Sequence, residues 1–118
     1  MEIHFYNDGL IKYLECKSGI ENIEDAKTII VSCVEHETDR VLILSQALPP
    51  AFYDLGSFFA GEFVQKLMNY RIRVAAVFES DNDYSERFRE YLFEAKKGQQ
   101  FRVFITRVDA ISWLSSEK

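Results

Sequence analysis

Hydrophobic and polar side chains alternate along the first part of the chain, and later segments change to helical spacing. Residues 2–6 alternate in this way, and residues 10–15 resume as a strand after the Asn-Asp-Gly sequence at 7–9. A strong turn sequence between two strand-like runs is typical of an antiparallel β-hairpin. The sequence therefore predicts two paired strands at the start of the chain, and Gly19 ends the second one.

The rest of the chain alternates between helix and strand patterns. Apolar positions at helical spacing predict helices at residues 22–37, 58–69, 84–97 and 109–114. Short apolar runs predict strands at residues 41–44, 71–78 and 101–105. The order is ββαβαβαβα, which favours a sheet covered by helices. We therefore expect one α/β domain over residues 1–118, with a mixed five-stranded sheet whose strands are largely parallel after the hairpin.

Polar residues next to these segments predict where the helices begin and end. Asn22 is expected to cap the first helix, and the acidic loop 79–83 is expected to cap the third. Asp109 is expected to open the last helix. Asn69 is a good residue type for a left-handed C-cap, so we expect the second helix to end there.

The composition narrows the class of protein. The chain has 118 residues, of which 47% are hydrophobic and 28% charged, and its formal net charge is −5. Such a chain fits one globular domain with its own core. The acidic balance argues against nucleic acids and membrane surfaces as partners. No apolar run approaches the length of a membrane span, about 18 residues. The N-terminus lacks a signal-peptide pattern, so we expect a cytoplasmic protein.

Cysteine and histidine are too few and too scattered to indicate a redox or metal site. Cys16 and Cys33 form no C-x-x-C sequence, so in a cytoplasmic chain we expect buried thiols rather than a redox pair. His4 and His36 lie far apart without metal-ligand spacing, which favours structural or surface roles. We therefore expect no cofactor.

Residues 52–70 are the segment in which we expect a functional surface. They include two of the five glycines and four of the ten phenylalanines, and two prolines precede them. From residue 59 on, apolar side chains form one wide helix face, and Glu62, Gln65, Lys66 and Asn69 lie on the opposite face. Asp54 and Ser57 are both good N-cap types just before this helix.

Two residues in this segment are unusual for their expected positions. Phe58 shares the polar stripe of the helix, so it is either tucked under the Pro49-Pro50 loop or exposed as a contact for a partner. Gly61 lies inside the first turns, where glycine costs about 1 kcal/mol relative to alanine. Such a glycine suggests close approach by another backbone or by a ligand.

The same segment matches a specific motif, F-F-D-L-x-T-G-x-A-G-E-x-x-Q-K-x-x-N-Y followed by an apolar strand. The matching residues are Phe52, Asp54, Leu55, Ala60, Gly61, Glu62, Gln65, Lys66, Asn69 and Tyr70. The motif resembles that of an uncharacterised bacterial family, domain of unknown function 4180. The resemblance covers essentially the whole chain and implies no established activity. Ser57 stands where that family has threonine, and Phe58 stands where it has glycine.

A more distant resemblance is to the STAS fold of anti-sigma-factor antagonists. It rests on the order of the elements and on residues 54–61, which are similar to the antagonists' D-S-S-G-L-G motif if one residue is inserted. In those proteins a partner kinase phosphorylates the second serine of the motif. The resemblance implies that Ser57 occupies the phosphorylated position and that the partner is a kinase-like regulator.

The leading hypothesis is a non-enzymatic interaction or regulatory module that binds a protein partner. Its candidate residues are Asp54, Gly56, Ser57, Phe58, Gly61, Glu62, Gln65, Lys66 and Asn69. A phosphate on Ser57 would add negative charge at a helix N-terminus, where free N–H groups favour it. Alternatively, Ser57 is only an N-cap, and the polar side chains of the helix are only a solvated face.

A second hypothesis is a small-ligand or magnesium site at the carboxyl ends of the strands. Asp54 and the acidic cluster of Glu79, Asp81 and Asp83 follow two of these strands, and clustered carboxylates suit Mg²⁺. A solvated acidic loop is the alternative explanation. The chain has no phosphate-binding glycine loop and no recognisable nucleophile–base pair, so we expect no enzymatic activity.

A third hypothesis is assembly of the chain into a homodimer. Aromatic residues make up 14% of the chain. We expect one small core not to accommodate all of Phe58, Tyr84, Tyr91 and Trp113, and surplus aromatic side chains suit a dimer face.

Overall fold

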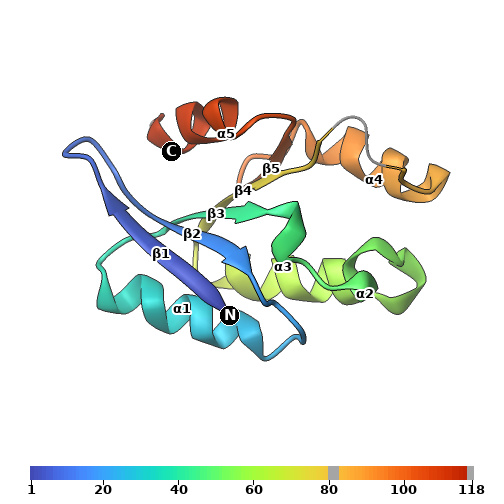
Figure 1. Cartoon of the computed structure of the whole chain (residues 1–118), viewed down its shortest axis with the longest axis horizontal. Coiled ribbons are helices and arrows are strands. Elements are labelled where there is room, and N and C mark those ends of the chain that lie inside the picture. Colours follow the sequence, from blue (N-terminus) through green and yellow to red (C-terminus); the bar gives the residue numbers. More distant parts are fainter. Residues whose placement is uncertain (80–82, 117–118) are drawn as a thin grey trace.

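A five-stranded mixed sheet forms the centre of the computed structural model, which describes residues 1–79 and 83–116 (Figure 1). The strands lie in the order β1-β2-β3-β4-β5. Their bounds are β1 (Glu2–Asn7), β2 (Lys12–Ser18), β3 (Arg40–Leu44), β4 (Arg73–Val77) and β5 (Phe101–Phe104). β1 is antiparallel to β2, and the other neighbouring pairs are parallel. The predicted α/β class and the mixed sheet are therefore confirmed.

The N-terminal hairpin forms where the sequence predicts it. The Asp8 carboxylate accepts hydrogen bonds from the backbone N–H groups of Leu10 and Ile11, both at 3.0 Å. Gly9 has a φ of 89°, a left-handed conformation that glycine adopts without steric strain. The turn therefore sets the register in which Asn7 pairs with Lys12.

Three helices cover one face of the sheet, namely α1 (Asp25–Glu35), α3 (Phe59–Asn69) and α4 (Glu86–Ala95). They share a face because parallel strands in chain order, joined by right-handed crossovers, place all their connections on the same side. The main core lies between these helices and the sheet. It includes Leu14, Ile29, Val41, Ile43, Phe63, Leu67, Val74, Ala76 and Phe88. No helix within the described residues is long and apolar enough to cross a membrane.

The stretch 45–57, which lies between the predicted strand 41–44 and the predicted helix 58–69, contains three short helical turns. They are η1 (Ser45–Ala47), α2 (Pro50–Tyr53) and η2 (Leu55–Ser57). Phe52 explains why α2 is ordered, since its ring is buried and lies about 6 Å from the rings of Phe59, Phe78 and Phe88. Aromatic packing of this kind anchors the whole connection on the core.

Two helix ends near the predicted sites differ in detail. The prediction that Asn69 is a left-handed C-cap is wrong, because the left-handed residue is Arg71, with a φ of 59°. Asn69 stays helical, and its side chain accepts a hydrogen bond from Gln65 at 2.8 Å. Asn22 accepts from the backbone N–H of Asp25 and so caps the turn that precedes α1, not α1 itself.

Hydroxyl side chains, and not the predicted acids, cap the last two helices. Ser85 caps α4 by accepting a hydrogen bond from the N–H of Phe88 at 3.2 Å. Thr106 caps α5 (Arg107–Ser115) by accepting from the N–H of Asp109. The predictions for loop 79–83 and for Asp109 as helix start were therefore wrong. Residues 80–82 lie outside the described part of the chain.

Helix α5 lies on the opposite face of the sheet, above it in Figure 1, where α1 and α3 lie below. Its buried side chains are Ala110 and Leu114, which pack in a second core with Leu42, Ala75 and Val77. Ile111 and Trp113 are partly buried against the same core. Polar contacts anchor both ends of the helix as well.

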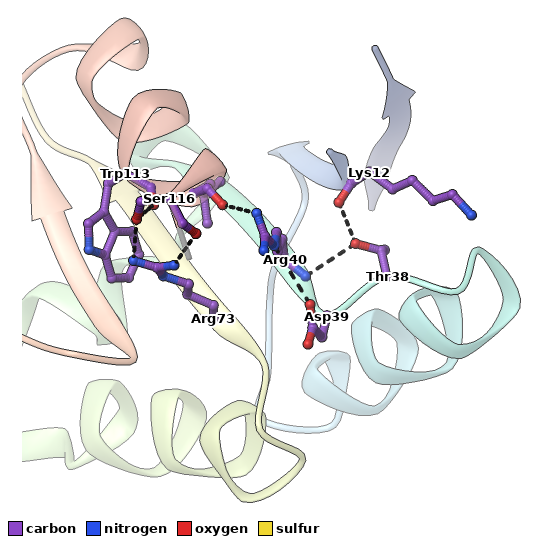
Figure 2. A network of polar contacts seen from close by, with 8 residues as sticks. Lys12, Thr38, Asp39, Arg40, Arg73, Trp113 and Ser116 are labelled. Atoms are coloured by element: carbon purple, nitrogen blue, oxygen red, sulfur yellow. Dashed lines mark hydrogen bonds and ion pairs between the residues drawn. The ribbon is translucent and has the colours of Figure 1, made fainter. Parts of the chain in front are cut away.

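Arginines from the sheet bind the C-terminal end of α5 (Figure 2). Arg73 donates to the carbonyl oxygen of Ser116 at 2.8 Å and to its hydroxyl at 2.9 Å. Arg40, the partner of Arg73 on the neighbouring strand, donates to the carbonyl of Leu114. The Arg73 guanidinium also lies over the Trp113 ring, 4.1 Å from its centroid. Cations at this position suit the negative end of a helix and satisfy its free carbonyls.

An ion pair between a buried carboxylate and an exposed arginine anchors the N-terminal end of α5. The Glu15 side chain on β2 is 2% exposed, and its Oε1 accepts from Arg107 Nε at 3.1 Å and Nη2 at 2.6 Å. Arg107 Nη2 also donates to the Tyr13 hydroxyl at 3.3 Å. The hydrogen bond with Glu15 is the main cause that raises the pKa of Arg107. Sequence analysis did not predict this pair, which joins residues 92 positions apart.

We expect Arg107→Met to lower the free energy of unfolding by about 1–3 kcal/mol, since it leaves the buried Glu15 carboxylate without its hydrogen-bonded cation. The double variant Glu15→Leu/Arg107→Met should recover most of this loss, because two apolar groups then replace both charges. Urea denaturation of the wild type, both single variants and the double variant measures these differences. If the change in free energy of unfolding of the double variant equals the sum of the two single changes, the two side chains do not interact and the prediction is wrong.

Candidate functional site

The predicted surface lies where α2 and η2 lead into α3. Asp54 follows α2, and its Oδ1 accepts from the backbone N–H of Gly56 at 3.1 Å, so it caps η2 and not α3. Both Asp54 and Gly56 are exposed. The structure therefore places these two candidate residues together at one exposed corner, beside Ser57 and Phe58.

The Ser57 hydroxyl connects the three elements at this corner. Its Oγ lies 2.7 Å from the carbonyl oxygens of both Ala51 and Asp54, which share its single hydroxyl proton. The same oxygen accepts from the N–H of Phe59, the first residue of α3, at 3.2 Å. Ser57 is exposed even though its hydroxyl makes all these contacts. It is therefore both a structural residue of the helix start and accessible from solvent.

Phe58 is the N-cap residue of α3 and is exposed. Its side chain is 72% exposed, so of the two predicted arrangements the ring adopts the exposed one and is not tucked under Pro49 and Pro50. Its φ is 64°, in the left-handed region that residues with a Cβ seldom adopt. Glycine, which the motif quoted above has at this position, would adopt this conformation without strain. The chain thus presents an aromatic ring from a strained backbone position.

The two faces of α3 are divided as predicted. The buried side chains are Phe59, Ala60, Phe63, Val64 and Leu67. Glu62, Gln65 and Asn69 are exposed on the other face, and Lys66 is half-buried. Phe58, Glu62, Gln65 and Asn69 therefore form one continuous exposed strip along α3.

Gly61 is exposed, and no other part of the described chain lies close to it. A Cβ built at this residue would meet no atom within 4 Å, so no neighbouring backbone approaches it closely. The expectation of close approach by another part of this chain is wrong. Gly61 adds to the open strip beside Phe58, where it leaves the backbone of the first turn of α3 uncovered.

The predicted acidic site is not assembled by the residues that the structure describes. Within residues 1–79 and 83–116, no group of three or more His, Cys, Asp or Glu side chains could hold a metal ion. Glu79 lines two cavities beside β5, and neither cavity is lined by Asp54 or Asp83. Asp81 lies outside the described residues.

The two cavities that Glu79 lines were not predicted from the sequence. One lies between α4 and β5, and the other lies beyond the carboxyl ends of β3, β4 and β5. Their lining residues come from segments that are far apart in the sequence. No local sequence pattern therefore indicates either cavity. Two basic side chains line the first cavity, Arg89 on α4 and Lys96 at its C-cap.

The comparisons with known proteins agree with the motif. The family described as Domain of unknown function (DUF4180) matches residues 8–114. The chain belongs to the DUF4180 family. The match spans β2 to α5 and therefore includes both the Phe58 corner and the cavities. Comparison with curated proteins and with solved structures finds no match to the chain.

In this DUF4180 domain the two cysteines are buried, as predicted. Burial raises the pKa of the Cys16 thiol to about 12, and Cys33 and Glu15 contribute to the shift. We expect neither cysteine of the native protein to react with iodoacetamide at pH 8, because the thiolate is the reactive species. Mass spectrometry should find two modified thiols after denaturation in urea. Rapid modification of the native chain would contradict this expectation.

The strain at Phe58 can be separated from the effect of its ring by two substitutions. Phe58→Ala removes the exposed ring but keeps the Cβ, so we expect little change in the free energy of unfolding. Phe58→Gly also removes the Cβ, and it should be more stable than Phe58→Ala by about 1 kcal/mol because φ is positive. Urea denaturation measures both values. A glycine variant less stable than the alanine variant would show that residue 58 is not strained.

Proposed function

We propose that this chain is a non-enzymatic regulatory module that binds a protein partner through the corner at Phe58 and the exposed strip of α3. The observation that supports it most directly is the Phe58 ring, which is 72% exposed on a backbone with a φ of 64°. Both features cost free energy in the isolated chain, and local strain of this kind concentrates at functional sites. A partner that buries the Phe58 ring would gain binding free energy from the apolar surface that is removed from water.

The surroundings of Phe58 fit a protein contact. Aromatic side chains are common central anchors of interfaces, and a polar rim surrounds such anchors. Around Phe58 the rim consists of Asp54, Ser57 and Glu62, with Gln65 and Asn69 further along α3. Phe52, buried beneath the corner, fixes α2 on the core. The anchor would therefore be presented by a rigid support.

Phosphorylation of Ser57 would switch this surface in our proposal. The hydroxyl donates to the carbonyls of Ala51 and Asp54, and a phosphate on Oγ removes that donor. The phosphate would then be repelled by these carbonyls and by the Asp54 carboxylate, whereas the N–H groups at the start of α3 would attract it. The η2 turn would have to rearrange, and Phe58, the next residue, would move with it.

The proposal includes a distant relationship with the STAS fold and a cytoplasmic location in a bacterium. The mixed sheet, the order of the elements and the exposed serine before α3 support that relationship. By this analogy the partner of the Phe58 corner is a kinase-like regulator. A homodimer formed through the same corner is the competing arrangement.

The test places a photo-crosslinking amino acid, p-benzoylphenylalanine, at position 58 in cells that naturally produce the protein. A matched chain has it at Val34, which is exposed on α1. We expect position 58, and not position 34, to cross-link one defined protein that mass spectrometry identifies. Cross-links to a second copy of the chain would contradict the proposal and favour the homodimer.

The identified partner then allows a quantitative prediction. Phe58→Ala should weaken its binding by about 30-fold, as expected for loss of an interface anchor worth about 2 kcal/mol. Ser57→Asp should also weaken it, and Val34→Ala should bind like the wild type. Isothermal titration calorimetry with purified proteins measures the dissociation constants. Equal affinities of wild type and Phe58→Ala would overturn the proposed surface.

A further inference from the structure

The two open cavities beside β5 adjoin one another, because Glu79 and Ile105 line both. The cavity between α4 and β5, called here the α4–β5 cavity, has a volume of about 380 Å³. The second cavity has a volume of about 570 Å³ and is lined by the more polar residues Ser45, Gln46, Thr106 and Arg107. Volumes of about 300–1,000 Å³ are typical of sites for small molecules. Neither cavity shares a lining residue with the Phe58 corner.

Apolar side chains form most of the α4–β5 cavity. They are Phe78, Leu92, Phe93, Val103, Phe104 and Ile105. Two of them are unusually exposed for their type, Phe93 at 58% and Ile105 at 49%. The exposure arises because β5 is an edge strand of the sheet and α4 turns Phe88 towards the main core. The molecule therefore has an apolar surface here that its own elements leave uncovered.

The charged residues around this apolar surface indicate the sign of a ligand. Arg89 lies on α4, and Lys96, seven residues further on, is the C-cap residue of the helix with helical backbone angles, which places the two about two turns apart on the same side. Neither forms an ion pair within residues 1–79 and 83–116. Glu79 is the acid that lines the cavity. Among the lining residues that the structure describes, two cations and one acid leave an excess of one positive charge, although the chain as a whole has a net charge of −5.

We propose that the α4–β5 cavity binds a small amphipathic monocarboxylate. Its aliphatic or aromatic part would lie against Leu92, Phe93 and Ile105, and its carboxylate would bind Arg89 and Lys96. A metal ion, which the sequence suggested for the acids near Glu79, does not match this lining, because the cavity is apolar and has a cationic excess. The site is independent of the proposed partner surface at Phe58.

The first test titrates isotope-labelled protein with sodium octanoate and follows backbone NMR shifts. We expect saturable shifts at Leu92, Phe93, Val103 and Ile105. 1-Octanol, which has an eight-carbon alkyl chain and no charge, should bind more weakly than octanoate. Octylammonium, whose head group is positive, should bind weakest of the three. Octanoate shifts confined to another part of the chain, or equal affinity for octylammonium, would overturn the proposal.

Variants then test the named residues. Arg89→Gln/Lys96→Gln should weaken octanoate binding by at least about tenfold, the usual contribution of a hydrogen bond to a charged group, and leave octanol binding unchanged. Arg87→Gln is the matched control, since Arg87 is exposed on the same helix and does not line the cavity. An equal effect of the control would contradict a specific carboxylate site.

A bulky substitution tests the apolar half of the cavity. Ile105→Trp should weaken both octanoate and octanol, because the larger ring fills the space between α4 and β5. Ile105 is half-exposed, so the variant should fold, which urea denaturation confirms. Phe58→Ala should bind octanoate like the wild type, which distinguishes this site from the partner surface. Unchanged affinity of a folded Ile105→Trp variant would exclude the cavity as the site.

Discussion

Helix α5 covers the face of the sheet opposite α1, α3 and α4, and polar contacts at its two ends fix it there. Helix α5 has nine residues and fully buries only Ala110 and Leu114, while Ile111 and Trp113 are partly buried against the same core. These apolar contacts hold the middle of the helix against the sheet. The Glu15–Arg107 ion pair at one end and the arginines on β3 and β4 at the other hold its two ends.

With α5 fixed, one face of the sheet is covered by α5 and the other by α1, α3 and α4. Several large apolar side chains stay exposed outside these two cores, and two of the surfaces they form carry our proposals. At the Phe58 corner a single ring projects from a helix start, which suits a macromolecular partner that can surround it. Beside β5 several apolar side chains line a hollow with cations at its rim, which suits a small anion. The shape of each surface thus favours a different class of ligand.

Local patterns were enough to predict the five strands and the four longer helices, because apolar spacing reflects which face of each strand or helix meets the core. The short turns in residues 45–57 have no such spacing and were not predicted. The two faces of α3 followed from apolar spacing, and the buried cysteines from the absence of a C-x-x-C sequence. Contacts between distant residues could not be predicted, and the Glu15–Arg107 pair is the clearest case, since its partners lie on β2 and α5. The α4–β5 cavity was missed for the same reason. At Phe58 the sequence left two arrangements open, because the conformation there is set by hydrogen bonds of its neighbour.

Those hydrogen bonds explain how a small chemical change could control the Phe58 corner. A left-handed backbone costs a residue with a Cβ roughly 1–2 kcal/mol. Each net hydrogen bond contributes about 0.5–1.5 kcal/mol, and the Ser57 hydroxyl contacts the carbonyls of Ala51 and Asp54 and the N–H of Phe59. The free-energy cost of the left-handed backbone at Phe58 and the free energy contributed by the Ser57 hydrogen bonds are therefore of similar magnitude. Loss of the hydroxyl hydrogen would remove much of this support while the strain at Phe58 stays, so the balance would shift towards a rearranged corner. A modification of Ser57 would then act on the position of the ring as well as on the charge of the surface.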